Sequence, residues 1–184
     1  VFELETRVNA MEVDIDRELS SIIARRQPTA RDLRLLIAIS KTTANLERAG
    51  DEAEKIARMV KSIISSGAAR ALPASELRVA ADLASGLLRK ALDAFARLDV
   101  NMAVSILKED DAIDREFDGF VRKLITYMME DPRTISASID LVFVAKAIER
   151  IGDHAKNLAE QIIYIVKGTD VRHNSLENVE SIVR

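Results

Sequence analysis

The chain contains no cysteine among its 184 residues, and it has few residues that interrupt helices, with six glycines and three prolines. The absence of cysteine excludes disulfides, thiolate metal ligands and a thiolate nucleophile, and it is typical of a reducing compartment such as the cytoplasm. No signal-peptide pattern opens the sequence. Apolar stretches such as "DLVFVAKAI" (140–148) are far shorter than the ~20 residues that a membrane span requires.

The chain also lacks a large excess of positive or negative charge. Its formal net charge is −3, with 31% charged and 48% hydrophobic residues. A protein that binds nucleic acid usually carries a basic surface, so no nucleic-acid partner is expected. The abundant residues are Leu, Ala, Ile, Glu, Arg and Lys, which are strong helix formers. The composition therefore predicts an all-α fold.

Apolar residues at spacings of three and four predict five helices, over 1–25, 32–65, 75–98, 100–130 and 133–167. Breaks fall at Pro28, in the connection "SSGAARALPAS" (65–75), near Asp99, and at Asp131–Pro132. Gly168 is expected to end the last of the five helices. Residues 169–184 are expected to form a polar C-terminal tail.

The chain carries an internal repeat. Leu46 and Gly50 recur as Ile148 and Gly152, displaced by 102 residues, and "IDREL" (15–19) matches "IDREF" (113–117). The helix at 75–98 has no counterpart before residue 1, so we expect the first copy's opening helix to lie upstream. The predicted architecture is a tandem pair of homologous three-helix bundles, the first (1–66) with two of its helices present and the second (75–168) complete.

Each copy has one helix whose apolar spacing predicts a bundle seam. In the first copy the seam residues are Leu36, Ile39, Thr43, Leu46, Gly50, Ala53, Ala57, Val60 and Ile64. In the second copy they are Leu141, Ala145, Ile148, Gly152, Ala155, Ala159, Ile162 and Val166.

Four acidic pairs with i, i+4 spacing adjoin these apolar positions, and such a spacing places both carboxylates on one helix face. The pairs are Glu12 with Asp16, Glu47 with Asp51, Asp110 with Asp114, and Glu149 with Asp153. An antiparallel hairpin brings the pairs of neighbouring helices level, most clearly in the second copy, where Asp114 and Glu149 are nearly equidistant from the turn at Asp131–Pro132. Facing carboxylates repel unless a cation or shared protons intervene.

These carboxylates predict a metal site in each copy, and oxygen ligands suit Mg, Mn, Fe or Zn. The glycine inside the Glu47–Asp51 pair and inside the Glu149–Asp153 pair costs helix stability but allows a neighbouring helix or a metal cluster to approach closely. The alternative is that the carboxylates are solvated and pair with Arg48, Arg150 and Lys55. The residues alone leave both interpretations open.

Other candidate residues give weaker evidence of a functional site. His154 is expected at the surface, His173 lies in the tail, and neither forms the Glu-x-x-His of di-iron sites. No phosphate-binding glycine loop and no Ser/His/Asp set is present, which argues against an enzyme. A basic cluster near the first turn is typical of a solvated helix end, and the alternative is a contact with an anion or an acidic partner. Its residues are Arg25, Arg26, Arg31 and Arg34.

Three segments resemble the PhoU family of phosphate-specific transport system accessory proteins. They are "RRQPTARDLRLLIAISKTTANLERAGDEAEKIARM" (25–59), "YMMEDPRTI" (127–135) and "AIERIGDHAKNLAEQIIYIVKGTDVRH" (147–173). The resemblance runs from about residue 8 to residue 173, and its most specific part is the doubled E-R-x-G-D core.

The resemblance implies a cytoplasmic, often dimeric protein that negatively regulates phosphate uptake and the phosphate-starvation response. It implies partners in the phosphate transporter's ATPase subunit and the phosphate-sensing histidine kinase, and contact with the membrane only through them. It also implies a divalent or ferric metal cluster on E(D)xxxD motifs, which all four acidic pairs match. The leading interpretation is a non-enzymatic metal-binding regulator. The alternatives are a metal-independent helical adaptor and, more distantly, a hydrolase or oxidase.

Overall fold

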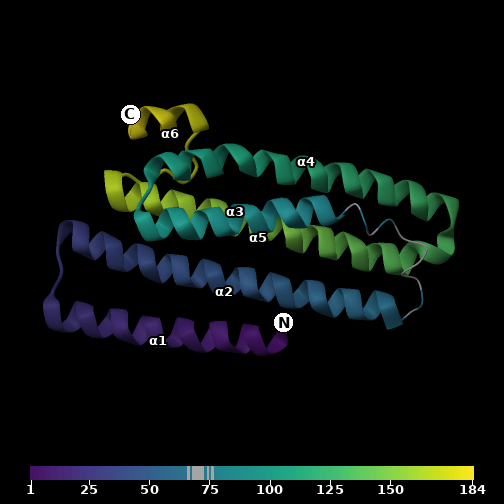
Figure 1. Ribbon diagram of the computed structural model, residues 1–184, viewed down its shortest axis with the longest axis horizontal. Coiled ribbons are helices and arrows are strands. Elements are labelled where there is room, and N and C mark those ends of the chain that lie inside the picture. The colour runs from purple at the N-terminus through teal and green to yellow at the C-terminus, as the bar shows by residue number, and fades with distance from the viewer. Residues whose placement is uncertain (66, 68–72, 74, 76) are drawn as a thin grey trace.

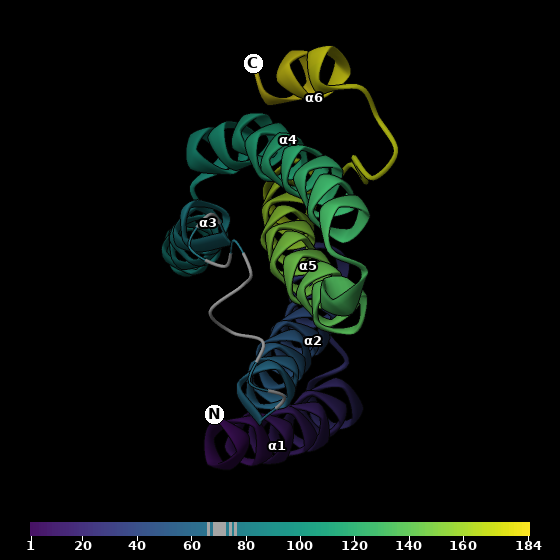
Figure 2. The same cartoon turned by 90° about the vertical axis from the view of Figure 1, so that its right-hand side faces the viewer.

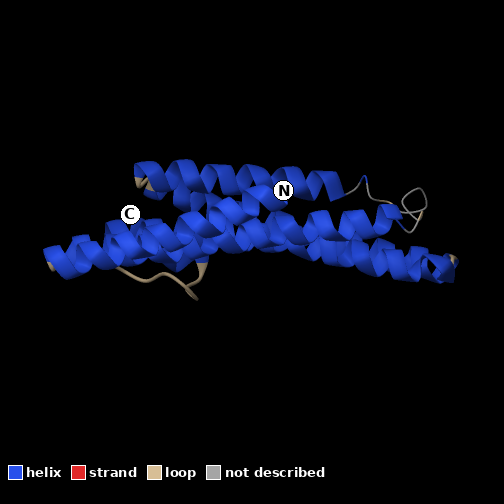
Figure 3. Cartoon of the chain, turned by 90° about the horizontal axis from the view of Figure 1, so that it is seen from below, coloured by secondary structure: helices blue, strands red, loops and turns tan. Residues whose placement is uncertain are grey.

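The computed structural model describes all residues except 66, 68–72, 74 and 76, and the elements of this described part are all helical (Figures 1 and 3). The elements are α1 (Phe2–Arg26), α2 (Ala30–Ser65), α3 (Leu77–Arg97), α4 (Val100–Glu130), a 3₁₀ turn (Pro132–Thr134), α5 (Ile135–Lys167) and α6 (Leu176–Val183). The predicted all-α fold is confirmed. Most of the expected connection at 65–75 lies outside the described residues.

Helix α5 is the centre of the arrangement. The end view shows α4, α5, α2 and α1 in one row, with α3 beside α4 and α5 (Figure 2). Helices α2 and α5 run antiparallel, because Ser62 bonds to Asp140 near one end of the contact and Asn157 bonds to Asn45 further along it. Among the described helices, none combines the length and apolarity that crossing a membrane requires.

The helix ends follow the local signals in the sequence. Asp99 caps α4 by accepting a hydrogen bond from the Met102 N–H. Asp131 accepts one from the Arg133 N–H, so the chain passes through the 3₁₀ turn before α5 begins at Ile135, two residues later than predicted. Gly168 ends α5 as expected, in a left-handed conformation with φ 76°.

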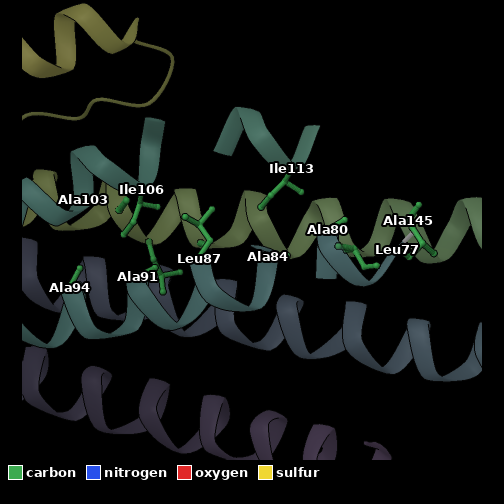
Figure 4. Packing of buried hydrophobic residues seen from close by; sticks show 14 of the residues in the cluster. Leu77, Ala80, Ala84, Leu87, Ala91, Ala94, Ala103, Ile106, Ile113 and Ala145 are labelled. Atoms are coloured by element: carbon green, nitrogen blue, oxygen red, sulfur yellow. The ribbon is translucent and has the colours of Figure 1, made fainter. Parts of the chain in front are cut away.

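The core of the second copy is formed where α3, α4 and α5 meet. Helix α3 contributes mainly small side chains at its buried positions, which lets the three helices pack closely (Figure 4). The predicted α5 seam is buried throughout, apart from Val166 at its end. Burial of this seam stabilises the bundle at roughly 25 cal/mol per Å² of apolar surface removed from water.

The seam of the first copy differs from the prediction. None of its nine residues is fully buried, and Val60 and Ile64 are exposed, Ile64 by 64%. The physical reason is that, in the described part of the chain, no helix covers α1 and α2 as α3 covers α4 and α5. The buried positions of α2 are instead Ala38, Thr42, Ala49, Glu52 and Ile63.

The C-terminal tail contains a helix that the sequence pattern did not reveal. Helix α6 lies against α4 (Figures 1 and 2), Val171 and Val179 are buried in the core cluster, and Glu180 pairs with Lys108. Eight residues give too short a periodic signal to be recognised as a helix. Residues 169–184 are therefore docked on the second bundle, rather than a polar tail alone.

The unequal burial of the two seams can be tested at one repeat position. Ile148 is 4% exposed, whereas its counterpart Leu46 is only partly buried. We expect Ile148→Ala to lower the free energy of unfolding by about 2–4 kcal/mol and Leu46→Ala to lower it by about 1 kcal/mol. Urea unfolding followed by circular dichroism measures both. Equal losses would contradict the difference in burial.

Candidate metal centre

The carboxylates of the second copy lie close together between α4 and α5. Burial and, to a smaller extent, the negative charges of Glu149, Asp110 and Asp114 together raise the pKa of Asp153 to about 6. The pKa of Asp114 is also raised, first by burial and then by Asp110 and Glu149. The structure therefore brings the four predicted residues of this copy into one electrostatic cluster, which we call the second quartet.

Two lysines neutralise part of the second quartet. Lys156 Nζ lies 2.8 Å from Oδ2 of Asp110, whose side chain is 2% exposed. Lys146 Nζ lies 2.6 Å from Oε1 of Glu149, and the other oxygen of Glu149 is buried without a hydrogen-bond partner. Sequence reasoning missed both lysines. The i, i+3 spacing of Lys146 and Glu149 was a usable signal, whereas Lys156 and Asp110 meet only in the fold.

Gly152 shows why a glycine stands inside this acidic pair. A Cβ atom at this position would lie 2.8 Å from Ile113 Cδ1 and 3.6 Å from Asp110 Oδ1. The glycine thus allows α4 and its carboxylate to approach α5 closely. At Gly50 the nearest atom would be Val8 Cγ1 at 3.8 Å, an ordinary contact. Close helix approach therefore explains Gly152 but not Gly50.

The first-copy carboxylates are more loosely grouped. The pKa of Glu47 is raised by burial, then by Asp51 and Glu12, and to a lesser extent by Glu5, which the sequence reasoning did not include. Asp16 is exposed and accepts a hydrogen bond from Ser40 Oγ at 3.1 Å. The structure thus groups Glu12, Glu47 and Asp51, and it places Asp16 beside Ser40 on the hairpin surface.

The donor atoms of the second quartet are of the type that a hard cation prefers. All four donors are carboxylates, which Mg²⁺, Mn²⁺ and iron accept readily. The raised pKa of Asp153 and the unpartnered oxygen of Glu149 are both features that a bound cation would relieve. As positioned, no three acidic or histidine side chains among the described residues are close enough to hold a metal. A cation would have to displace the two ammonium groups, and the ligand roles stay predictions.

A second feature lies where the two copies meet. The repeated cores contribute Arg48, Asp51, Arg150 and Asp153 to a cleft of about 490 Å³ between α2 and α5. His154 also lines this cleft, half-buried, with Nδ1 3.0 Å from Asn45 Oδ1. Burial lowers the pKa of His154. The expectation of a surface histidine is therefore wrong, because the packing of α2 on α5 could not be inferred from the helix pattern.

Comparison with known proteins agrees with the repeat and the fold. A family model described as "PhoU domain" matches residues 1–60 and 77–162. A Burkholderia protein named "Phosphate-specific transport system accessory protein PhoU homolog" is 53% identical over 180 residues, covering 97% of this chain and 77% of the relative. The Escherichia coli K12 protein, "Phosphate-specific transport system accessory protein PhoU", is 49% identical over 173 residues, covering 94% and 71%.

Solved structures agree as well. The crystal structure of PhoU from Pseudomonas aeruginosa superposes with a TM-score of 0.87 at 46% identity, covering 91% of this chain and 79% of that one. The phosphate transport system regulatory protein PhoU from Streptococcus pneumoniae gives 0.74 at 26% identity, covering 92% and 82%. With the family model matching both halves, and relatives this similar along nearly its whole length, the chain belongs to the PhoU family.

Proposed function

We propose that the chain is a non-enzymatic regulator of phosphate transport. The observation that carries this proposal is its 53% identity, over 97% of the chain, to a relative named as a phosphate-specific transport system accessory protein homolog. The structural neighbour from Streptococcus pneumoniae is named a phosphate transport system regulatory protein. A relative so similar along so much of the chain makes a shared role in phosphate transport the simplest interpretation.

In its full form the proposal is a negative regulator in the cytoplasm. It acts on phosphate uptake and phosphate-starvation signalling, and it links the transporter's ATPase subunit to the sensor histidine kinase, commonly as a homodimer. The long helix faces of α2 and α5 supply surface for protein contacts. The sequence has no phosphate-binding glycine loop and no Ser/His/Asp set, which favours a regulator over a hydrolase or oxidase at the second quartet.

We further propose that the second quartet binds a metal cluster and that the first copy provides a similar, more easily perturbed site. The acidic clustering and the buried unpartnered oxygen of Glu149 support it. The alternative is a metal-independent adaptor, which the pairing of Lys146 and Lys156 with two of the carboxylates favours. Elemental analysis of protein purified without chelators or a metal column decides between them.

The regulatory proposal predicts the effect of losing the protein. We expect a strain lacking the gene to keep phosphate-starvation genes expressed in phosphate-rich medium, because the signal that silences them is lost. A reporter fusion measures this, and the purified protein should bind the kinase's cytoplasmic portion or the ATPase subunit. Normal silencing together with no binding to either partner would rule the proposal out. Turnover of a phosphorylated substrate that requires Asp153 would favour an enzyme instead.

A further inference from the structure

A groove of about 420 Å³ lies where the C-terminal half of α2 packs against the N-terminal half of α5. Its lining combines four cations, a methionine and an aromatic ring with a single carboxylate, Glu52. We call it the α2–α5 groove and define it by Lys55, Arg58, Met59, Phe143, Lys146 and Arg150. None of these six is a predicted metal ligand.

The groove continues into an exposed apolar stripe on α5. Ile135, Ile139 and Phe143 are spaced by four residues, so they lie on one helix face. They are exposed by 41%, 46% and 53%, and they extend about 12 Å along the axis at 1.5 Å per residue. Aligned large apolar side chains on a surface usually mark an interaction site. A ligand that filled only the groove would not reach Ile135, whereas a helix laid along α5 would.

The groove is locally positive although the chain as a whole is negative. Glu52 is the only carboxylate in the lining, its side chain is buried, and it is shared by Lys55 Nζ at 2.8 Å and Arg150 Nη1 at 3.2 Å. One negative charge thus serves two cations, and Lys146 pairs with Glu149 outside the lining at 2.6 Å. With Glu54 beside Arg58, the four cations face three carboxylates, which leaves an excess of one positive charge. Arg58 makes a surface pair with Glu54, and such pairs contribute little and exchange readily. The groove is therefore complementary to a negatively charged segment.

We propose that the α2–α5 groove and the apolar stripe together bind an acidic amphipathic helix of a partner protein. Apolar residues at i, i+4 and i+8 of that helix would cover Ile135, Ile139 and Phe143, and carboxylates beyond them would meet the cations of the groove. This is helix-in-groove recognition, in which apolar anchors supply affinity and charge supplies register. The inference rests on the proposed function only in expecting a protein partner, and it adds the surface and the chemistry of the bound segment.

A synthetic peptide tests the surface independently of any named partner. The probe is a fluorescein-labelled helical peptide of about 18 residues, with leucines at i, i+4 and i+8 followed by glutamates, measured with the full chain by fluorescence anisotropy. We expect saturable binding that weakens about tenfold when glutamine replaces the glutamates or when salt rises from about 0.05 to 0.3 M. Phe143→Ser and Arg58→Glu should each weaken binding about tenfold.

Matched surface variants serve as controls. Ile125→Ser on α4 removes an apolar side chain of similar exposure, 47%, and Arg97→Glu reverses an exposed arginine on α3. Both should bind the peptide as the parent chain does, and thermal unfolding should show all four variants folded. Absence of saturable binding, equal binding of the glutamine peptide, or insensitivity to Phe143→Ser and Arg58→Glu would each overturn the proposal.

Two other possible occupants of the α2–α5 groove would give different results in these experiments. If Phe143→Ser dissociates a dimer in analytical ultracentrifugation while the peptide fails to bind, the groove is an interface between copies of this chain. If an adenine nucleotide binds there and the peptide does not, the groove is a small-molecule site. Either result overturns the proposal. The starvation-gene reporter is unaffected by the peptide assay, so failure of this inference and failure of the regulatory proposal are distinguishable.

Discussion

If the second quartet binds metal as proposed, replacing Glu149 with Gln and Asp153 with Asn is expected to remove most of that metal. The change deletes two negative charges and two charged donors while keeping side-chain size. Loss of an outer-shell partner alone typically costs 10–100-fold in metal affinity, so losing two ligands should cost at least about 100-fold. Elemental analysis and a metal titration of the full chain measure the loss.

The matched control is Glu47→Gln with Asp51→Asn at the same repeat positions of the first copy. This variant should leave the second quartet's metal in place, so metal per chain should fall by the first-copy share only. The metal-free Glu149→Gln, Asp153→Asn protein should be at least as stable as the parent, since burial and three neighbouring carboxylates oppose the charge of Asp153. A well-folded variant with unchanged metal content would show that these carboxylates are not ligands.

The fold could be predicted from the sequence to the extent that it depends on local pattern. Periodic apolar residues located five helices, and Asp131, Pro132 and Gly168 marked where α5 begins and ends. The pattern could not show which face of α2 is buried, because that depends on a packing partner. Thr42 and Glu52 are buried at or near the contact with α5, whereas the more regular seam through Leu46 is only partly covered.

The acidic residues of the candidate metal site could be predicted from the sequence, but the lysines that pair with them could not. The i, i+4 spacing identified all four pairs, and the balanced hairpin indicated that Asp114 would meet Glu149, which the electrostatic coupling of these groups supports. Lys156 was missed because it lies on α5 and reaches a carboxylate on α4. The α2–α5 groove was missed for the same reason. Its residues come from two helices, and the apolar pattern of neither helix shows that the two pack together.

The two lysines connect the second quartet to the surfaces around it. Lys146 holds Glu149 and also lines the α2–α5 groove, with its ammonium 5.2 Å from the centre of the Phe117 ring. Lys156 holds Asp110 and lines a second depression formed with Arg172 and His173. These ammonium groups compensate buried carboxylates, so a metal cation bound as proposed would compete with the lysines for the same oxygens.

Lys156→Met is therefore expected to lower the stability of the metal-free protein and to raise its affinity for metal. Methionine keeps the unbranched stem but removes the charge, which leaves Asp110 buried at 2% exposure without its ammonium partner. Removing one partner of a buried ion pair costs about 3–5 kcal/mol, and the 41% exposure of Lys156 places the expected loss at the lower end of that range. A cation would then bind without displacing an ammonium group, and we expect its apparent affinity to rise about tenfold.

The matched control is Lys90→Met, which removes a lysine that pairs with Glu109 between α3 and α4, where the carboxylate is 50% exposed instead of buried like Asp110. Surface pairs contribute about 0–1 kcal/mol, so this variant should change neither stability nor metal affinity appreciably. Thermal unfolding with and without added Mn²⁺ measures both quantities, and the stabilisation by Mn²⁺ should be larger in Lys156→Met than in the parent chain. If Lys156→Met lowered stability and left the response to Mn²⁺ unchanged, Lys156 would be a structural partner of Asp110 and not a competitor for a cation.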